Sequence, residues 1–228
     1  MTKLSLIIPA YNEEKRLPSS ITKIIDYFSK IDYLYEIIVV DDASDIPIAQ
    51  YLPSRIKVIR NLQNKGKGFS VKQGVLAATG EYIFFSDADL STPISEIDKL
   101  LTALDHGADV SIGSRGLLAS DIQVAQPIWR QTMGKMFNVL VRLLILPGIY
   151  DTQCGFKGFK REIAKKVFPQ LTIEGFGFDI EVLFLAKKYG AQVIEIPIAW
   201  KNDKESTVNP FTDSLKMLVD IFKIRFSR

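Results

Sequence analysis

Short apolar segments that each end in polar residues recur through the first half of this 228-residue chain. Segments with apolar residues at three- and four-residue spacing separate them, most clearly over Leu17–Phe28, and this spacing is typical of helices. The alternation predicts an α/β fold with a mostly parallel sheet covered by helices on both faces. The strands predicted in this half are residues 3–8, 35–40, 55–60, 81–86 and 108–113.

The second half is less regular, and no linker separates it from the first. We therefore expect a single domain over residues 1–228, with one half at about 1–115 and another at about 116–228. Further helices are expected after Gly68 through Ala78 and at residues 95–104, and in the second half at 129–146, 163–168, 178–189 and 211–226. A strand is expected at 192–200, and residues 151–160 are interpreted as a Gly-rich, aromatic loop.

The charge of the chain is uneven. Its formal net charge is only +3, which argues against nucleic acid as a partner. Residues 115–166, however, hold nine Lys and Arg against Asp121, Asp151 and Glu162, so the remainder is net acidic. A basic segment of this kind indicates one face that meets anions, such as a phosphate, a nucleotide or an acidic lipid surface.

Three features of the sequence bear on the cellular location of the protein. Cys154 is the only cysteine, which excludes an intrachain disulfide and is typical of a reducing compartment. The chain opens directly into a predicted strand, with no signal peptide. No stretch reaches the ~20 apolar residues of a spanning helix. We therefore expect a cytoplasmic protein without a transmembrane span.

Two phosphate-binding motifs are missing from the sequence. No Gly-x-Gly-x-x-Gly follows the first predicted strand, and no Gly-x-x-x-x-Gly-Lys-Ser/Thr occurs. Their absence argues against a dinucleotide oxidoreductase and a P-loop NTPase. Pro9-Ala10-Tyr11-Asn12-Glu13-Glu14 follows the first strand instead.

The tripeptide Asp87-Ala88-Asp89 directly follows the apolar strand at 81–86. Two carboxylates at a strand end can bind Mg²⁺ or Mn²⁺ through oxygen. Such an ion can bridge the phosphates of a nucleotide-sugar and neutralise the leaving diphosphate. The tripeptide alone occurs more often in a solvated turn; its place at a strand end favours the metal site, with Asp87 and Asp89 as ligands.

Two other polar clusters occupy comparable positions. Asp41-Asp42 ends the second predicted strand, where a carboxylate can accept hydrogen bonds from a base or a ribose; the alternative is a helix cap and a turn. Lys67 lies between Gly66 and Gly68, where backbone N–H groups and an ammonium can both reach a phosphate; the alternative is a flexible basic turn.

In this order, Pro-Ala-Tyr-Asn-Glu-Glu, Val-Val-Asp-Asp-Ala-Ser, Asn-x-Gly-Lys-Gly and Ser-Asp-Ala-Asp resemble the family 2 glycosyltransferases of the GT-A fold over residues 3–115. The resemblance implies a nucleotide-sugar donor, a UDP-sugar or alternatively a GDP-sugar. It also implies the role of each matching residue. Pro9, Tyr11, Glu13 and Asp42 would line the base and ribose site, Lys67 would help at the nucleotide, and Asp87 and Asp89 would serve the metal and diphosphate.

A basic helix is predicted in the second half. Arg115 follows the fifth predicted strand, and Arg130 opens the helix at 129–146. Lys135 and Arg142 are seven residues apart and share a helical face. The helix is either a packed amphipathic element with solvated cations or an interfacial helix that presents cations to a phosphate headgroup at a membrane.

The second half resembles the dolichyl-phosphate β-glucosyltransferases through Asp151-Thr152-Gln153-Cys154-Gly155-Phe156-Lys157, Gly177-Phe178-Asp179-Ile180-Glu181 and the segment from Trp200 to Thr207. This resemblance implies an inverting transfer of a sugar, with glucose favoured, to a polyprenyl phosphate. It places Arg115 and Arg130 for the lipid phosphate. It also implies a peripheral protein on the cytoplasmic face of a membrane.

The chain departs from this family in three places. Members close to the glucosyltransferase carry an N-terminal membrane anchor, whereas this chain begins at its first strand. Other relatives continue with C-terminal spans where this chain stops. The family's Gly-Ser-Lys after the late Trp is here Glu205-Ser206-Thr207. The helix at 211–226 either packs on the domain or lies on a membrane.

The acceptor decides which groups must be catalytic. A phosphate monoester has a second pKa of about 6, so a polyprenyl phosphate needs little general-base help, and the protein would position it and stabilise the leaving group. A sugar hydroxyl would require a carboxylate base, for which Asp179 and Glu181 are candidates; both can instead favour the helix dipole.

Three functions remain open from the sequence. They are a polyprenyl-phosphate glycosyltransferase, a soluble family 2 enzyme that glycosylates a saccharide or protein hydroxyl, and a non-catalytic nucleotide-sugar-binding or membrane-associated protein on the same fold. Two residues are set aside. His106 is interpreted as a surface residue and Cys154 as a packing residue.

Overall fold

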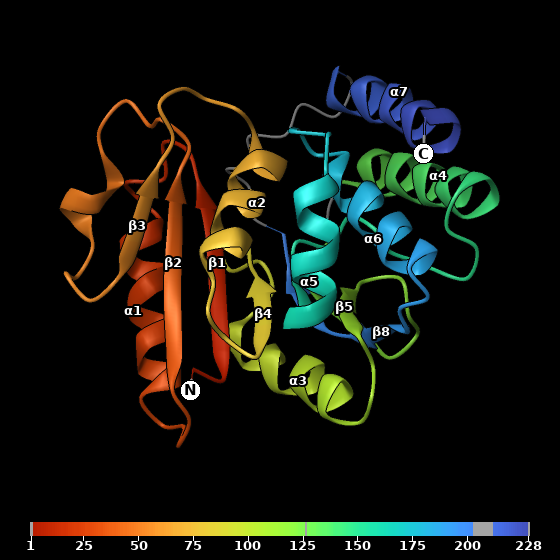
Figure 1. The fold of residues 1–228 in the computed structure, drawn as a ribbon. Helices are drawn as coiled ribbons and strands as arrows, with labels where there is room; N and C mark the ends of the chain where they lie inside the picture. Colours follow the sequence, from red (N-terminus) through yellow and green to blue (C-terminus); the bar gives the residue numbers. More distant parts are fainter. Residues whose placement is uncertain (1, 126, 203–211, 228) are drawn as a thin grey trace.

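The computed structural model describes residues 2–125, 127–202 and 212–227. Seven strands form one sheet in the order β3-β2-β1-β4-β7-β5-β8 (Figure 1). All neighbouring pairs are parallel except the two that involve β7, which confirms the mostly parallel sheet. The strands are β1 Leu4–Ala10, β2 Tyr35–Asp41, β3 Lys57–Arg60, β4 Tyr82–Phe85, β5 Val110–Ser114, β7 Lys157–Lys160 and β8 Val193–Pro197.

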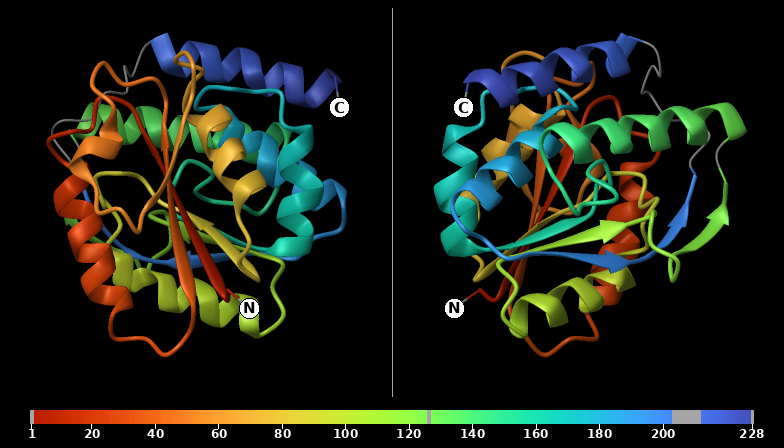
Figure 2. Two further views of the ribbon diagram at one scale, coloured as in Figure 1. Left: turned by 60° about the vertical axis from the view of Figure 1, so that its left-hand side comes forward. Right: turned by 90° about the vertical axis from the view of Figure 1, so that its right-hand side faces the viewer.

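Helices cover both faces of this sheet, as predicted (Figure 2). One face carries α1 and α3, and the other carries α2, α5 and α6, with α4 and α7 beyond that layer. Short 3-10 turns lie at Ile48–Tyr51, Ile94–Glu96 and Phe168–Gln170. The helices are α1 Leu17–Phe28, α2 Lys67–Ala77, α3 Ile97–Asp105, α4 Ile128–Leu144, α5 Arg161–Val167, α6 Phe178–Lys188 and α7 Thr212–Ser227.

The central strands are buried on both faces because each face has its own hydrophobic cluster. In β1, Ile7 belongs to the cluster under α2, whereas Leu6 and Ile8 belong to the cluster under α1. Successive side chains of a strand point to opposite faces, so a strand between two helical layers must be apolar at every position. All four residues of β4 are buried. This explains the continuous apolar segments of the sequence.

Residues 151–160 are not wholly a loop, and that prediction was wrong for Lys157–Lys160. These residues form β7, which lies antiparallel between β4 and β5. Phe159 is fully buried there and stacks on Phe85 at 6.1 Å between ring centroids. Burial of this ring in the middle of the sheet outweighs the local preference of the two glycines for a loop. Since β7 runs against its neighbours, the residues that precede it reach the carboxyl edge of the parallel strands.

Two further differences concern short strands. The strand predicted at 192–200 is divided into β8 and β9 Ala199–Lys201, because the chain leaves the main sheet at Pro197, which has no N–H to donate. β9 pairs with β6 Asp121–Val124 in a separate two-stranded sheet. β6 was not predicted, since its polar-apolar alternation covers only four residues, three of which are exposed.

Helices α4 and α7 pack with one side and expose the other. Val141 of α4 and Ile221 and Ile224 of α7 are buried, so α7 packs on the domain, and its neighbouring turns still expose Phe222 and Phe226. In the described ranges, no helix combines the length and apolar character needed to cross a membrane. The segment Glu205-Ser206-Thr207 lies outside the described residues.

Candidate functional site

The loops that follow β1, β2 and β4 meet at the carboxyl edge of the sheet. Each contains a residue other than glycine with a positive φ: Asn12 at 53°, Ala43 at 61° and Leu90 at 51°. This backbone conformation is uncommon for such residues and gathers at binding sites. Asn12 also ties two of the loops together, since its side-chain oxygen accepts a 2.9 Å bond from the backbone N–H of Asp45.

A cavity of about 430 Å³ lies against these loops. It unites residues from four separate motifs of the sequence, and all but one of the residues predicted for the nucleotide side line it. The predicted residues that line it are Pro9, Tyr11, Glu13, Asp42, Lys67, Asp87, Ala88 and Asp89.

Asp42 is buried and organises the loop that leads into α2. Its carboxylate accepts the N–H of Gly66 at 2.7 Å, the N–H of Lys65 at 3.0 Å and the Asn61 side-chain amide at 2.7 Å. A bound ribose or base would therefore meet a carboxylate that is already fixed in place. Glu13 is held in a similar way by Arg16, whose Nε lies 2.8 Å from its carboxylate.

Asp41 is the exception, because it does not line the cavity. Its buried carboxylate accepts the backbone N–H of Ser44 at 2.9 Å and of Ile48 at 3.2 Å, and it forms an ion pair with Arg60. Burial by itself would raise the pKa of Asp41, but these bonds outweigh it and lower the pKa below its usual value. The structure therefore places Asp41 as a support of the loop after β2, away from the expected nucleotide site.

Lys67 begins α2 and lies between two carboxylates. Its Nζ is 2.5 Å from Oδ1 of Asp87. Burial would lower the pKa of Lys67, but Asp87 and then Asp179 outweigh it and raise that pKa above its usual value. The side chain therefore remains an ammonium, at the N-terminus of a helix whose dipole also favours an anion.

The donor atoms at Asp87 and Asp89 fit a hard divalent cation. Asp87 lies against the backbone of Gly155, where a β-carbon would come within 2.0 Å of Oδ2, and Asp89 accepts the N–H of Ser91 at 2.8 Å. Within the described ranges, no group of three or more His, Cys, Asp or Glu could hold a metal. Mg²⁺ and Mn²⁺ suit such a site, since they combine one or two carboxylates with water and substrate phosphate oxygens.

A second cavity, of about 250 Å³, opens on the other side of the same carboxylates. Lys67, Asp87 and Asp89 line both cavities. Arg115, Arg130 and Asp179 line the second cavity but not the first. A smaller cavity of about 170 Å³ is also lined by Arg115 and Arg130 and continues from the second. All five residues predicted as catalytic thus surround one space.

Asp179 and Glu181 both belong to α6, but their side chains point to different surroundings. Asp179 faces the second cavity and is paired with the fully buried Lys157. Burial raises the pKa of Asp179 despite Lys157 and Lys67. Glu181 lines none of these cavities; it accepts the N–H of Thr172 at 3.0 Å and of Ile173 at 2.9 Å. Only Asp179 is therefore in a place to act on a substrate.

Several site residues were not assigned a role from the sequence. Gln153, Gly155 and Asn138 line the second cavity, and Trp200 lies under Arg115 at 5.3 Å. The motif at 151–157 was visible in the sequence, but its function depends on the antiparallel course of β7. His106 is exposed, and burial raises the pKa of Cys154 to about 11, so both are placed as expected.

Comparisons with known proteins agree with this geometry. Residues 5–168 match the model of glycosyl transferase family 2. A dolichyl-phosphate beta-glucosyltransferase of Dictyostelium discoideum is 35% identical over 98% of this chain and 74% of its own length. The human protein of the same name is 33% identical over 98% of this chain and 75% of its own length.

Among solved structures, the glucosyl-3-phosphoglycerate synthase of Mycobacterium tuberculosis in complex with Mn²⁺ and UDP-glucose superimposes with a TM-score of 0.76. It is 16% identical and covers 99% of this chain and 79% of that one. At this identity the likeness concerns the fold, and it confirms the expected GT-A architecture.

Proposed function

Because the chain belongs to glycosyl transferase family 2, we propose that it moves glucose from UDP-glucose to a polyprenyl phosphate such as dolichyl phosphate, with inversion at the sugar. The observation that carries this proposal is the shared wall of the two cavities. Lys67, Asp87 and Asp89 line both, so a diphosphate on one side and an attacking phosphate on the other would meet at these residues.

The donor half of the proposal rests on the first cavity. Its lining residues offer carboxylates for a base and a ribose and an ammonium for phosphate. The solved structure with the same fold binds UDP-glucose with Mn²⁺, and the curated relatives are named for glucose transfer. UDP-glucose is therefore favoured over other nucleotide-sugars.

We assign Asp87 and Asp89 to a divalent cation, Mg²⁺ or Mn²⁺. When bound, such a cation neutralises charge on the leaving diphosphate. The chain's own residues orient that group: the Lys67 ammonium approaches from the start of α2, and Asp42 fixes the loop that carries it. Positioning and electrostatic stabilisation of this kind are the main means of catalysis when the nucleophile needs no activation.

The acceptor half of the proposal rests first on two arginines in the second cavity. Arg115 and Arg130 line the second cavity, and Arg can bind phosphate through several N–H groups. Since a phosphate monoester is largely a dianion at neutral pH, it attacks without a general base. The role of the two arginines is then to bring it against a donor of the same charge.

We place the protein peripherally at a membrane, on the cytoplasmic face. Beside the second cavity, α4 exposes Ile128, Met136 and Leu143, and α7 exposes Phe222 and Phe226. Figure 2 shows these two helices on the same side of the molecule. An apolar surface next to basic residues is typical of helices that lie in a membrane interface, where the prenyl chain of the acceptor would also be found.

The test combines purified protein, Mn²⁺, a polyprenyl phosphate and radiolabelled UDP-glucose, with UDP-galactose and GDP-mannose as competing donors. We expect label from UDP-glucose in an acid-labile product that extracts into chloroform. Label only in water-soluble products, or none with any donor, contradicts the proposal.

One observation favours a second candidate, transfer to a saccharide or protein hydroxyl. Asp179 lies in the cavity with a raised pKa, as a general base requires. The two functions differ in the residues on which they depend. Transfer to a hydroxyl should fall by about a thousandfold or more in Asp179→Asn and should be indifferent to Arg115→Ala and Arg130→Ala. Transfer to a phosphate should instead depend on Arg115 and Arg130.

A further inference from the structure

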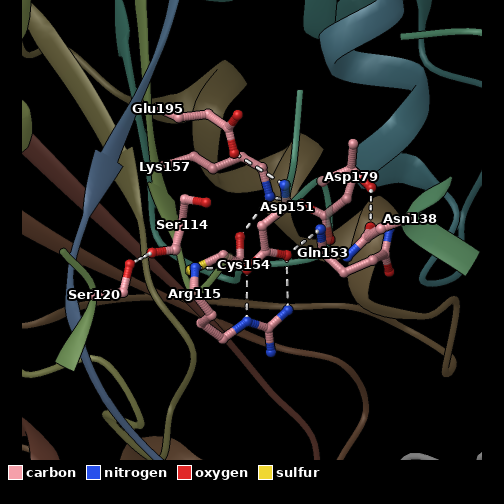
Figure 3. A network of polar contacts seen from close by, with 11 residues as sticks. Ser114, Arg115, Ser120, Asn138, Asp151, Gln153, Cys154, Lys157, Asp179 and Glu195 are labelled. Carbon is pink, nitrogen blue, oxygen red and sulfur yellow. Dashed lines mark hydrogen bonds and ion pairs between the residues drawn. The ribbon is translucent and has the colours of Figure 1, made fainter. Parts of the chain in front are cut away.

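The guanidinium of Arg115 is held along one edge by Asp151. Its Nε lies 2.7 Å from Oδ2 and its Nη2 lies 2.9 Å from Oδ1. Figure 3 shows these two parallel contacts, with the third nitrogen of the guanidinium pointing away from Asp151. The Nε–Nη2 edge, one of the two edges through which Arg can bind a phosphate with two N–H groups, is thus already occupied.

Asp151 is itself fixed from several directions. It is 2% exposed, and besides the guanidinium it accepts the backbone N–H of Arg115 at 2.9 Å and of Gln153 at 3.2 Å. Burial alone would raise its pKa, but Arg115 outweighs burial and lowers the pKa below its usual range. The carboxylate therefore stays ionised and has a single orientation.

Glu195 of β8 holds the backbone on which Asp151 is placed. One oxygen of its carboxylate accepts the N–H of Asp151 at 2.9 Å, and the other accepts the N–H of Tyr150 at 2.7 Å. The chain of contacts thus runs from the edge of the sheet through Glu195 and Asp151 to Arg115. Trp200 supports the guanidinium at 5.3 Å from the ring centroid.

We propose that Asp151, anchored by Glu195, is a positioning residue for the acceptor. It turns Arg115 so that the Nη1 end of the guanidinium, and not its Nε–Nη2 edge, meets the acceptor phosphate. This inference rests on the proposed function, in which Arg115 contacts that phosphate.

The consequence is a cation with little orientational freedom. Arg115 lines both the cavity at Asp87 and the smaller one that continues from it, so the orientation of its free end determines where a phosphate rests between them. A flexible cation would bind the phosphate at many angles, and few of these would align it for attack. A preoriented group keeps its N–H donors aimed at the reacting charge.

A double-mutant cycle tests whether Asp151 acts through Arg115. Arg115→Ala, Asp151→Asn and the double variant are compared in kcat/KM for farnesyl phosphate, with the Kd of UDP in Mn²⁺ as a check on the donor side. We expect Asp151→Asn to lower kcat/KM by about tenfold in the parent. In the Arg115→Ala background we expect a change of less than about twofold, and the Kd of UDP should stay the same in all four proteins.

Glu195→Gln provides a second route if Asp151→Asn does not fold. Its amide retains one acceptor for the backbone N–H groups and loses the other. We expect a smaller loss in kcat/KM than for Asp151→Asn, and again none in the Arg115→Ala background. A defect of folding alone would lower the amount of active protein equally in both backgrounds.

The outcomes separate this inference from the function on which it rests. Equal losses from Asp151→Asn with and without Arg115 overturn the positioning role and leave the acceptor assignment standing. An Arg115→Ala protein with unchanged kcat/KM for farnesyl phosphate overturns both.

Discussion

The α-carbon of Gly155 faces the Asp87 carboxylate so closely that a β-carbon on residue 155 would stand 2.0 Å from Oδ2. The two residues are 68 positions apart in the numbering, and the antiparallel course of β7 brings them together. Any side chain at position 155 would have to displace the Asp87 carboxylate, which lines both the first and the second cavity.

We therefore expect Gly155→Ala to remove activity while the protein still folds. The β-carbon moves Asp87 away from the proposed metal, which should lower kcat by about 100-fold or more. Turnover of UDP-glucose and thermal melting measure the two effects. Gly107→Ala is the control, because Gly107 lines none of the three cavities and a β-carbon there would meet nothing within 4 Å; the strain at its φ of 111° should appear in the melting temperature alone. A similar loss of turnover in both variants would contradict the steric argument.

Asp41 and Asp42 should differ sharply when each is changed to Asn. Asp42 lines the donor cavity and holds Lys65 and Gly66, so Asp42→Asn should raise the Kd of UDP by about tenfold or more. Asp41→Asn should lower the free energy of unfolding by about 1–3 kcal/mol, since buried N–H groups lose their acceptor, with little change in that Kd. Calorimetric titration measures the Kd of UDP, and chemical denaturation measures the free energy of unfolding of both variants. Equal increases in the Kd of UDP would contradict the placement of Asp41.

Acid should destabilise the fold partly through Asp41. Its pKa in the folded state lies below the usual value, so its ionised form stabilises the protein at pH values above the unfolded pKa of about 4. That contribution is lost as the pH falls through the lower folded pKa. We expect the melting temperature of the parent to fall more steeply below pH 4 than that of Asp41→Asn; parallel curves would argue against this assignment.

Removal of divalent metal should stop transfer reversibly. With EDTA we expect activity to fall to background, and Mn²⁺ in excess should restore it, because Asp87 and Asp89 are the proposed ligands of the cation that neutralises the leaving diphosphate. Asp89→Asn should resist this rescue. Full activity of Asp89→Asn, or of the parent in EDTA, would overturn the metal assignment.

The exposed apolar residues of α4 and α7 should carry membrane binding. Leu143 and Phe226 are each 79% exposed, and replacing either by Glu should lower binding to anionic vesicles by roughly tenfold, given the free energy of burying a large apolar side chain. Co-sedimentation with vesicles measures this.

Leu34→Glu is the control for the same experiment. Leu34 is 67% exposed and directly precedes β2, at the amino edge of the parallel strands, so its change should leave vesicle binding as it was. Equal losses in all three variants would indicate a general effect of charge in place of a docking surface.

Much of the donor site could be predicted from the sequence because its information is local. Tyr11, Asp42 and Asp87 each follow a largely buried strand, and the carboxyl ends of parallel strands lie at one edge of a sheet. The apolar strands thus fix the positions of Tyr11, Asp42 and Asp87 before any long-range contact is known. The resemblance of the motifs to known families added the prediction that Arg115 and Arg130 bind the acceptor phosphate.

Other roles depended on which way neighbouring side chains point. Asp41 and Asp42 are adjacent at a strand end, where successive side chains face opposite ways, and only Asp42 reaches the cavity. Asp179 and Glu181 are two apart on a helix, about 200° around its axis, and only Asp179 faces the substrate side. In each pair the residue type is the same or nearly so, and the packing of the element selects the functional one.

The sequence by itself determined the alternating architecture, the donor motifs and their common edge, because periodicity and strand-end position are properties of short segments. Only the tertiary structure decided that β7 enters the sheet antiparallel, that Gly155 lies against Asp87 and that Asp151 holds the Nε–Nη2 edge of Arg115. These contacts join residues that are distant along the chain. Their geometry arises from burial of Phe159 and its neighbours in a shared core, which no single segment specifies.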